Sequence, residues 1–144
     1  MSEATQAVPI HLKIVATLSL LWNAVGCFDF VMTQSRNEGY LESFSEAQRE
    51  FLSGHPSWII GAWGIAVFSG LLGSFLLLTR NKLAVPALTI SLIAMLTTSI
   101  HGYLIHDGFE VNGTGPAIFT AIIAAFCVVL VVYSRAMATR GVLR

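Results

Sequence analysis

Four long runs of apolar residues, separated by polar segments, dominate this chain. They cover about residues 10–32, 58–78, 83–105 and 116–133. Each run is close to the ~20 residues that an α-helix needs to cross the hydrocarbon core of a bilayer. The runs are continuous, whereas the strands of a membrane β-barrel alternate apolar and polar positions. The pattern therefore predicts an all-α integral membrane bundle of four transmembrane helices, in one domain that covers residues 1–144.

The segment between the first two runs, residues 34–57, has a different pattern. Its mainly apolar side has helical spacing and comprises Leu41, Phe44, Gln48 and Phe51, with most of the charges on the opposite side. Ser45 followed by Gln48, or Ser43 followed by Glu46, is a signal for the start of a helix. We therefore predict a short amphipathic helix at the membrane interface in this first outer loop. A lid over a cavity is the alternative interpretation.

The composition supports lipid as the main surroundings of the chain. Charged residues make up 11% of the 144 residues and hydrophobic residues make up 55%, and the mean hydropathy is +0.73. A soluble domain of this length has too much surface for its volume to hide so many apolar side chains. The formal net charge is zero and no basic patch is present, so nucleic acid is excluded as a partner.

The basic residues are distributed unequally between the two sides of the predicted bundle. Six lie on the side of the termini and the second connection: Lys13, Arg80, Lys82, Arg135, Arg140 and Arg144. Arg36 and Arg49 lie on the other side. Since Lys and Arg are enriched in short cytoplasmic loops, this bias of six to two predicts a multi-pass protein with both termini in the cytoplasm. We expect the first run to remain as a span and not to be cleaved as a signal peptide.

Polar residues inside the runs are the main indication of function. Asp29 shares one helical face with Trp22 and Gly26, and Asn23 flanks that face. Insertion of an Asp at the centre of a span costs ~3 kcal/mol, so we expect Asp29 to point into the bundle.

The third run contains candidate partners for these residues, Thr98 and His101. Counted along the helices, Asp29 and His101 reach similar depths. Asn23, Asp29, Thr98 and His101 are therefore the candidate residues for solute binding or proton relay. A structural hydrogen bond that joins two helices is the alternative.

Small residues are candidates for close helix packing. In the second run they recur every four residues, at Ala62, Ala66, Gly70 and Ser74. Such a stripe lets a neighbouring helix approach closely. Gly26 gives the first run a similar position. Packing within the chain is the favoured interpretation, and contact with a second copy or another membrane protein is the alternative.

No catalytic or metal-binding motif is present in the sequence. It has no nucleophile elbow, phosphate loop or metalloprotease helix. Cys27 and Cys127 lie inside apolar runs, and the four histidines lack the spacing of metal ligands. We therefore expect no enzymatic activity, no metal and no cofactor.

The segments "LWNAVGCFDFVMTQ" and "HPSWIIGAWGIAVFSGLLGS", together with the acidic outer loop, resemble a group of small bacterial inner-membrane proteins. These are uncharacterised four-helix proteins, and some carry the label of sugar transporter. The resemblance covers nearly the whole chain and implies a location in the bacterial inner membrane. A weaker similarity is to small multidrug-resistance transporters, which have four spans and an acidic residue in the first. This chain differs from them in its long outer loop and in the position of Asp29, nearer the outer rim.

Two functions remain open from the sequence. The first is a transporter of a small, sugar-like solute, with a polar site near Asp29 and His101. In that case Trp22 and Trp63 are candidates for stacking on a sugar ring. The second is a non-transporting accessory subunit that uses the outer loop or the small-residue stripe as a partner surface.

Overall fold

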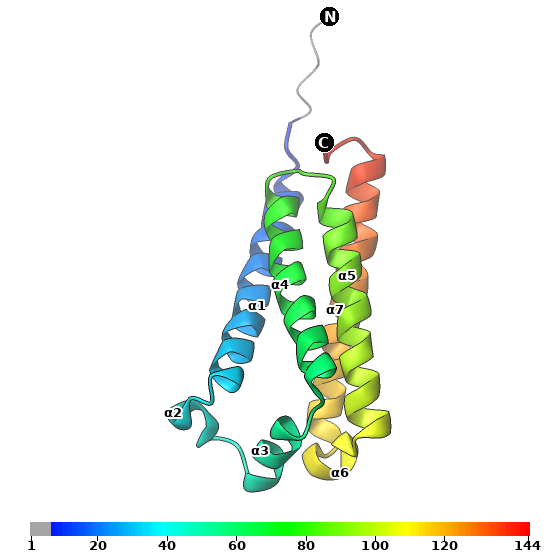
Figure 1. The fold of residues 1–144 in the computed structure, drawn as a ribbon. Coiled ribbons are helices and arrows are strands. Elements are labelled where there is room, and N and C mark those ends of the chain that lie inside the picture. The colour runs from blue at the N-terminus through cyan, green and yellow to red at the C-terminus, as the bar shows by residue number, and fades with distance from the viewer. Residues whose placement is uncertain (1–6) are drawn as a thin grey trace, which may run out of the picture.

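The computed structural model describes residues 7–144, which are helical over most of their length and contain no strand. Four helices are long and apolar enough to cross a membrane, which confirms the predicted four-helix membrane bundle (Figure 1). They are α1 (Ile10–Gln34), α4 (Ser57–Leu78), α5 (Ala84–Ile100) together with the turn that follows it, and α7 (Thr114–Thr139). Helix α5 is prolonged by one π-helical turn, η1 (His101–Ile105). The chain is thus a multi-pass membrane protein.

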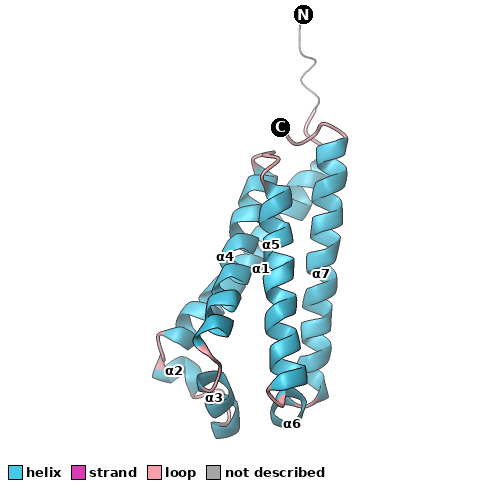
Figure 2. Ribbon diagram, turned by 45° about the vertical axis from the view of Figure 1, so that its right-hand side comes forward, coloured by secondary structure: helices cyan, strands magenta, loops and turns pink. Residues whose placement is uncertain are grey.

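Three short helices lie at one end of the bundle, which we call the connector end (Figures 1 and 2). They are α2 (Glu38–Leu41), α3 (Glu46–Ser53) and α6 (Gly108–Asn112). The described start and end of the chain and the turn at residues 79–83 lie at the opposite end, the terminal end. Helix α3 begins with a capping box formed by Ser45 and Gln48, one of the two predicted start signals.

The membrane helices pack in the order α1, α4, α5, α7. Helix α4 packs extensively on both α1 and α5, and α5 packs on α7. Helices α1 and α7 have little direct backbone contact. The outward faces carry many exposed apolar side chains, such as Leu18 and Leu21 on α1 and Val129 on α7. Lipid is the solvent that suits these faces.

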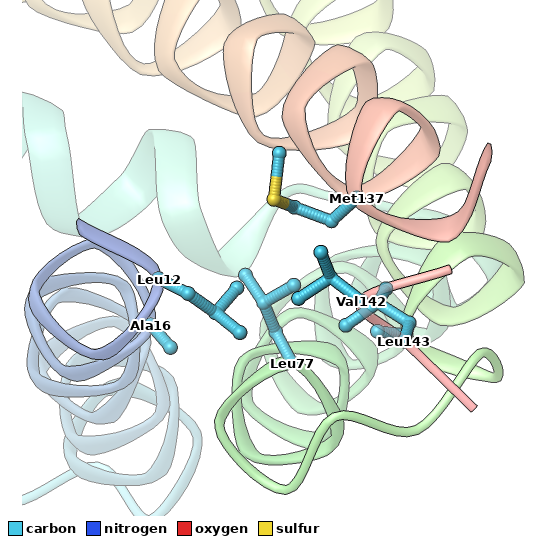
Figure 3. Close-up of a cluster of buried hydrophobic side chains, with 7 residues drawn as sticks. Leu12, Ala16, Leu77, Met137, Val142 and Leu143 are labelled. Atoms are coloured by element: carbon cyan, nitrogen blue, oxygen red, sulfur yellow. The ribbon is translucent and has the colours of Figure 1, made fainter. Parts of the chain in front are cut away.

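The tightest apolar core lies at the terminal end. It is formed by Leu12, Ala16, Leu77, Ala84, Met137, Val142 and Leu143. After α7 the chain turns at Gly141, where φ is +71°, and returns toward α4. Figure 3 shows Val142 and Leu143 on one side of Leu77, with Leu12 and Ala16 on the other. Because this end is closely packed, the spaces inside the bundle lie toward the connector end.

The helix boundaries agree with the four apolar runs except at the last one. Helix α7 continues to Thr139, six residues past the predicted end at residue 133. The added turns contain Ser134, which is fully buried, and Met137, which is 3% exposed. These turns pack against the core of the terminal end, so tertiary contacts extend the helix beyond its continuous apolar run.

Candidate functional site

A cavity of about 550 Å³ lies among the four membrane helices, in the half of the bundle nearer the connector end. Its polar lining comprises Asn23, Asp29, Tyr40, Ser91, Thr98, Ser99 and Thr120. Aromatic side chains of Trp22, Trp63 and Phe119 complete much of the wall. Asp29 is the one carboxylate among the lining residues, and no basic side chain lines the cavity. The cavity can therefore hold a small molecule that donates hydrogen bonds.

Asp29 is held by Tyr40, a residue of the segment between α1 and α4. The hydroxyl of Tyr40, on α2, donates a hydrogen bond to Asp29 Oδ1 at 2.5 Å. Helix α2 is itself started by Asn37, whose side chain accepts a hydrogen bond from the Tyr40 backbone N–H at 3.0 Å. The bond to Asp29 raises the pKa of Tyr40 to about 12, and partial burial and the negative charge of Asp29 add to this shift. A carboxylate has acceptor capacity beyond one bond, so Asp29 retains sites for a ligand.

On the side of the cavity nearer the terminal end, a small polar cluster joins α1 to α4. Ser19 Oγ and Ser74 Oγ, both fully buried, lie 2.6 Å apart and share a hydrogen bond. Asn23 Nδ2 donates to the Ser19 carbonyl oxygen at 2.8 Å and to Ser74 Oγ at 3.2 Å. The amide nitrogen of Asn23 is thus used for structure. Its oxygen, Oδ1, accepts no hydrogen bond within residues 7–144.

Gly70 is the point where this cluster meets α5. A Cβ atom added at Gly70 would lie 2.2 Å from Asn23 Oδ1 and 2.9 Å from Ser91 Oγ. Ser91 in turn donates to the Ala66 carbonyl oxygen of α4 at 2.6 Å. Only glycine leaves room here for a side chain from each neighbouring helix.

The small residues of α4 therefore pack within the chain. Ala66, Gly70 and Ser74 are buried, and Ala62 is partly buried. On α1, a Cβ added at Gly26 would meet the Val67 side chain of α4 at 3.5 Å.

The structure places three of the four candidate site residues around one cavity and the fourth elsewhere. Asn23, Asp29 and Thr98 line the cavity. His101 does not line it, and no hydrogen bond or ion pair joins His101 to Asp29 among the described residues. The His101 ring lies near the rings of Trp58, His55 and His106, at centroid distances of 5.4, 5.9 and 5.8 Å.

A second hollow, of about 240 Å³, lies between the cavity and the connector end. Phe51, Leu52 and His55 line its connector side. It shares Trp63, Thr98, Ser99 and Thr120 with the larger cavity. The two spaces therefore adjoin, and α3, which carries Phe51 and Leu52, borders the route between the cavity and the connector end.

Sequence reasoning missed two features of this site. It did not identify Tyr40 as the partner of Asp29, or Ser19 as a partner of Asn23. A signal for Ser19 was present, because residues four apart are neighbours on a helix. No local signal pointed to Tyr40, which meets Asp29 only because the segment between α1 and α4 folds back toward α1.

Comparison of this chain with models of protein families, with curated proteins and with solved structures gives no match. The cavity and its lining are therefore the basis for any assignment of function.

Proposed function

We propose that this protein is a membrane carrier for a small polar solute, which binds in the cavity beside Asn23, Asp29 and Thr98. The observation that carries this proposal is a cavity of about 550 Å³ with a carboxylate in its wall, inside a bundle of apolar helices. An ionisable residue within a membrane span is costly and commonly marks a path for a substrate or ion. The volume also lies within the roughly 300–1,000 Å³ typical of ligand pockets.

The lining suits a sugar-like solute. Asp29 and the free oxygen of Asn23 are acceptors for hydroxyl groups, and Thr98 and Thr120 add hydroxyls of their own. Trp22 and Trp63 offer aromatic faces to the apolar side of a ring. Trp22 also contacts Phe119 and Phe126 of α7, at centroid distances of 6.0 and 5.9 Å. The solute would thus touch all four membrane helices.

The packing of α4 argues against an accessory role that uses the small-residue stripe, and it leaves open an accessory role that uses the outer loop. An accessory role that uses the small-residue stripe would need Ala66, Gly70 and Ser74 on the surface, whereas all three are buried.

The bias of six basic residues to two supports cytoplasmic termini, and the proposed bacterial inner-membrane location rests on the resemblance described above. In that orientation the connector end faces outward and the cavity lies in the outer half of the membrane.

Binding and uptake by the purified protein in liposomes test this function. Quenching of tryptophan fluorescence by a panel of neutral sugars and polyols should identify a ligand, because two of the three tryptophans line the cavity. Asp29→Asn and Thr98→Val should each weaken its binding about tenfold or more, the value of one hydrogen bond to a charged or buried group. Glu46→Gln, an exposed carboxylate of α3 outside the cavity, is the matched control and should leave binding unchanged.

Uptake completes the test. Liposomes that contain the folded protein should accumulate the bound solute faster than protein-free liposomes. Equal rates for every member of the panel would contradict the carrier proposal.

A further inference from the structure

Three of the four histidines meet at the connector end, although they are far apart in the sequence. His55 lies between α3 and α4, His101 begins η1, and His106 follows η1. The His55 ring is 5.0 Å from that of His106 and 5.9 Å from that of His101, and the latter two rings are 5.8 Å apart. We call these three residues the histidine cluster. Within residues 7–144, no set of His, Cys, Asp and Glu side chains is arranged to hold a metal ion.

The cluster joins the end of α3 to the segment between α5 and α6. Phe51 of α3 stacks on His106, with ring centroids 5.0 Å apart and planes inclined by 28°. Phe51 also meets the His55 ring edge-on at 4.7 Å. On the other side, the Trp58 ring meets His101 edge-on at 5.4 Å. Helix α3 is thus attached to the segment between α5 and α6 through stacked rings.

The backbone is shaped to bring these rings together. In the π-helical turn, the His106 N–H donates to the His101 carbonyl oxygen at 2.9 Å, which sets the two imidazoles one turn apart. Such turns are rare and occur frequently at functional sites. Gly54 lets α3 approach, because a Cβ there would lie 3.3 Å from His106 Nε2.

The surroundings of His55 favour its neutral imidazole. His55 Nδ1 donates to the Phe51 carbonyl oxygen at 2.8 Å, and His101 Nδ1 is buried and has no hydrogen-bond partner among residues 7–144. The pKa of His55 is lowered, mainly by burial and further by the charges that His106 and His101 carry when protonated. The backbone bond to Phe51 partly opposes this shift.

Within residues 7–144, no carboxylate forms an ion pair with the histidine cluster. The charged and titratable groups on the elements around it are Glu46, Arg49, Glu50, Tyr103, Asp107 and Glu110. None of them forms an ion pair with His55, His101 or His106 among the described residues. Tyr103 is bonded instead to Thr120, at 3.2 Å between the two hydroxyl oxygens.

We propose that the histidine cluster is a pH-sensitive latch, which holds α3 over the hollow at the connector end and releases it when the cluster takes up protons. Neutral imidazoles pack against one another and against Phe51. Two or more imidazolium ions at these distances repel each other and require water. Phe51 and Leu52 line the hollow of about 240 Å³, so release of α3 widens the opening of that hollow. That this opening admits a solute rests on the proposed carrier function, whereas the movement of α3 does not.

The distance between two spin labels tests the movement directly. One label is placed on α3 at Ala47→Cys and the other at the start of α7 at Gly115→Cys, which are both exposed. The native thiols are removed by Cys27→Ala and Cys127→Ala, and the full chain is studied in lipid nanodiscs. The distance should lengthen by several ångströms between pH 7.5 and pH 5.

Histidine variants identify the groups that titrate. His106→Phe keeps a ring against Phe51 without a titrating group and should reduce the lengthening of the distance at pH 5. His55→Gln should shift the midpoint of the transition and reduce its amplitude. His11→Gln is the matched control, because His11 lies near the terminal end, where its Nδ1 is 2.6 Å from the Tyr133 hydroxyl. It should leave the transition unchanged.

Two results would overturn the latch: a distance that does not change between pH 7.5 and pH 5, or a change that persists in full in both His106→Phe and His55→Gln. The outcome is separate from that of the uptake assay. A pH-dependent distance without uptake supports the latch and contradicts the carrier. Uptake with a label distance that is the same at pH 7.5 and pH 5 supports the carrier and contradicts the latch.

Discussion

Substitution of Gly70 by Ala is the sharpest test of how α1, α4 and α5 fit together. The added Cβ would lie 2.2 Å from Asn23 Oδ1 and 2.9 Å from Ser91 Oγ, and both distances are shorter than side-chain atoms tolerate. Neither neighbour can move freely. Asn23 is held by its hydrogen bonds to Ser19 and Ser74, and Ser91 is held by its bond to the Ala66 carbonyl.

The size of the effect follows from these contacts. Forcing an extra methyl group into a packed interior costs about 1–3 kcal/mol. Displacement of Asn23 also weakens two hydrogen bonds, each worth ~0.6 kcal/mol within a membrane. The better helix propensity of Ala returns up to ~1 kcal/mol. Gly70→Ala should therefore lower the free energy of unfolding by about 1–3 kcal/mol.

Gly61→Ala is the matched control in the same helix. A Cβ at Gly61 would meet nothing within 4 Å, so this variant should be as stable as the wild type or slightly more stable. Reversible unfolding of both variants in one detergent gives the comparison. Adding Asn23→Ala to Gly70→Ala should recover part of the loss, because the clashing oxygen is removed. Equal stabilities of Gly70→Ala and Gly61→Ala would refute the packing described here.

Three further predictions concern the connector and the orientation of the chain. Asp29→Asn should return the pKa of Tyr40 from about 12 toward its ordinary value of 10, measured from tyrosinate absorbance with Tyr40→Phe as the reference; an unchanged titration would mean that the bond to Asp29 is absent. Because the folded chain holds the pKa of His55 below its ordinary value, the unfolded state binds more protons, and stability should fall as the pH drops through about 6.5 and toward the folded pKa. The melting temperature should record this fall, and His55→Gln should make it smaller; the same fall in both proteins would argue against His55. Cysteine at Ala47 should react with an impermeant reagent in intact cells and cysteine at Thr79 should not, and the reverse pattern would invert the proposed topology.

The four spans are predictable from the sequence because a bilayer imposes a simple rule on each of them separately. A span must satisfy its own backbone and expose apolar side chains over about 20 residues, and this rule needs no knowledge of the neighbouring helices. The start of α3 is equally local, since the capping box of Ser45 and Gln48 involves residues three positions apart.

The partners of the polar residues are harder to predict. Counting residues gives the height of Asp29 and His101 along their helices, but it does not give the direction in which each side chain points around its axis. Asp29 instead accepts a hydrogen bond from Tyr40, whose position depends on how the segment between α1 and α4 folds back. The π-helical turn itself brings His101 and His106 together, whereas His55 meets both because α3 packs against this turn. The contacts of His55 are tertiary, and no spacing in the sequence encodes them.

The polar cluster of α1 and α4 also bears on how the first span enters the membrane during synthesis. Asn23 donates to the carbonyl of Ser19 in its own helix, so one of its amide hydrogens is already bonded when α1 is alone in lipid. Ser74 arrives with α4, the next membrane helix to be made, and completes the bonds to Ser19 and Asn23. The buried polar groups at this level of α1 therefore need only the first two spans, and neither α5 nor α7 must be present before α1 can settle in the bilayer.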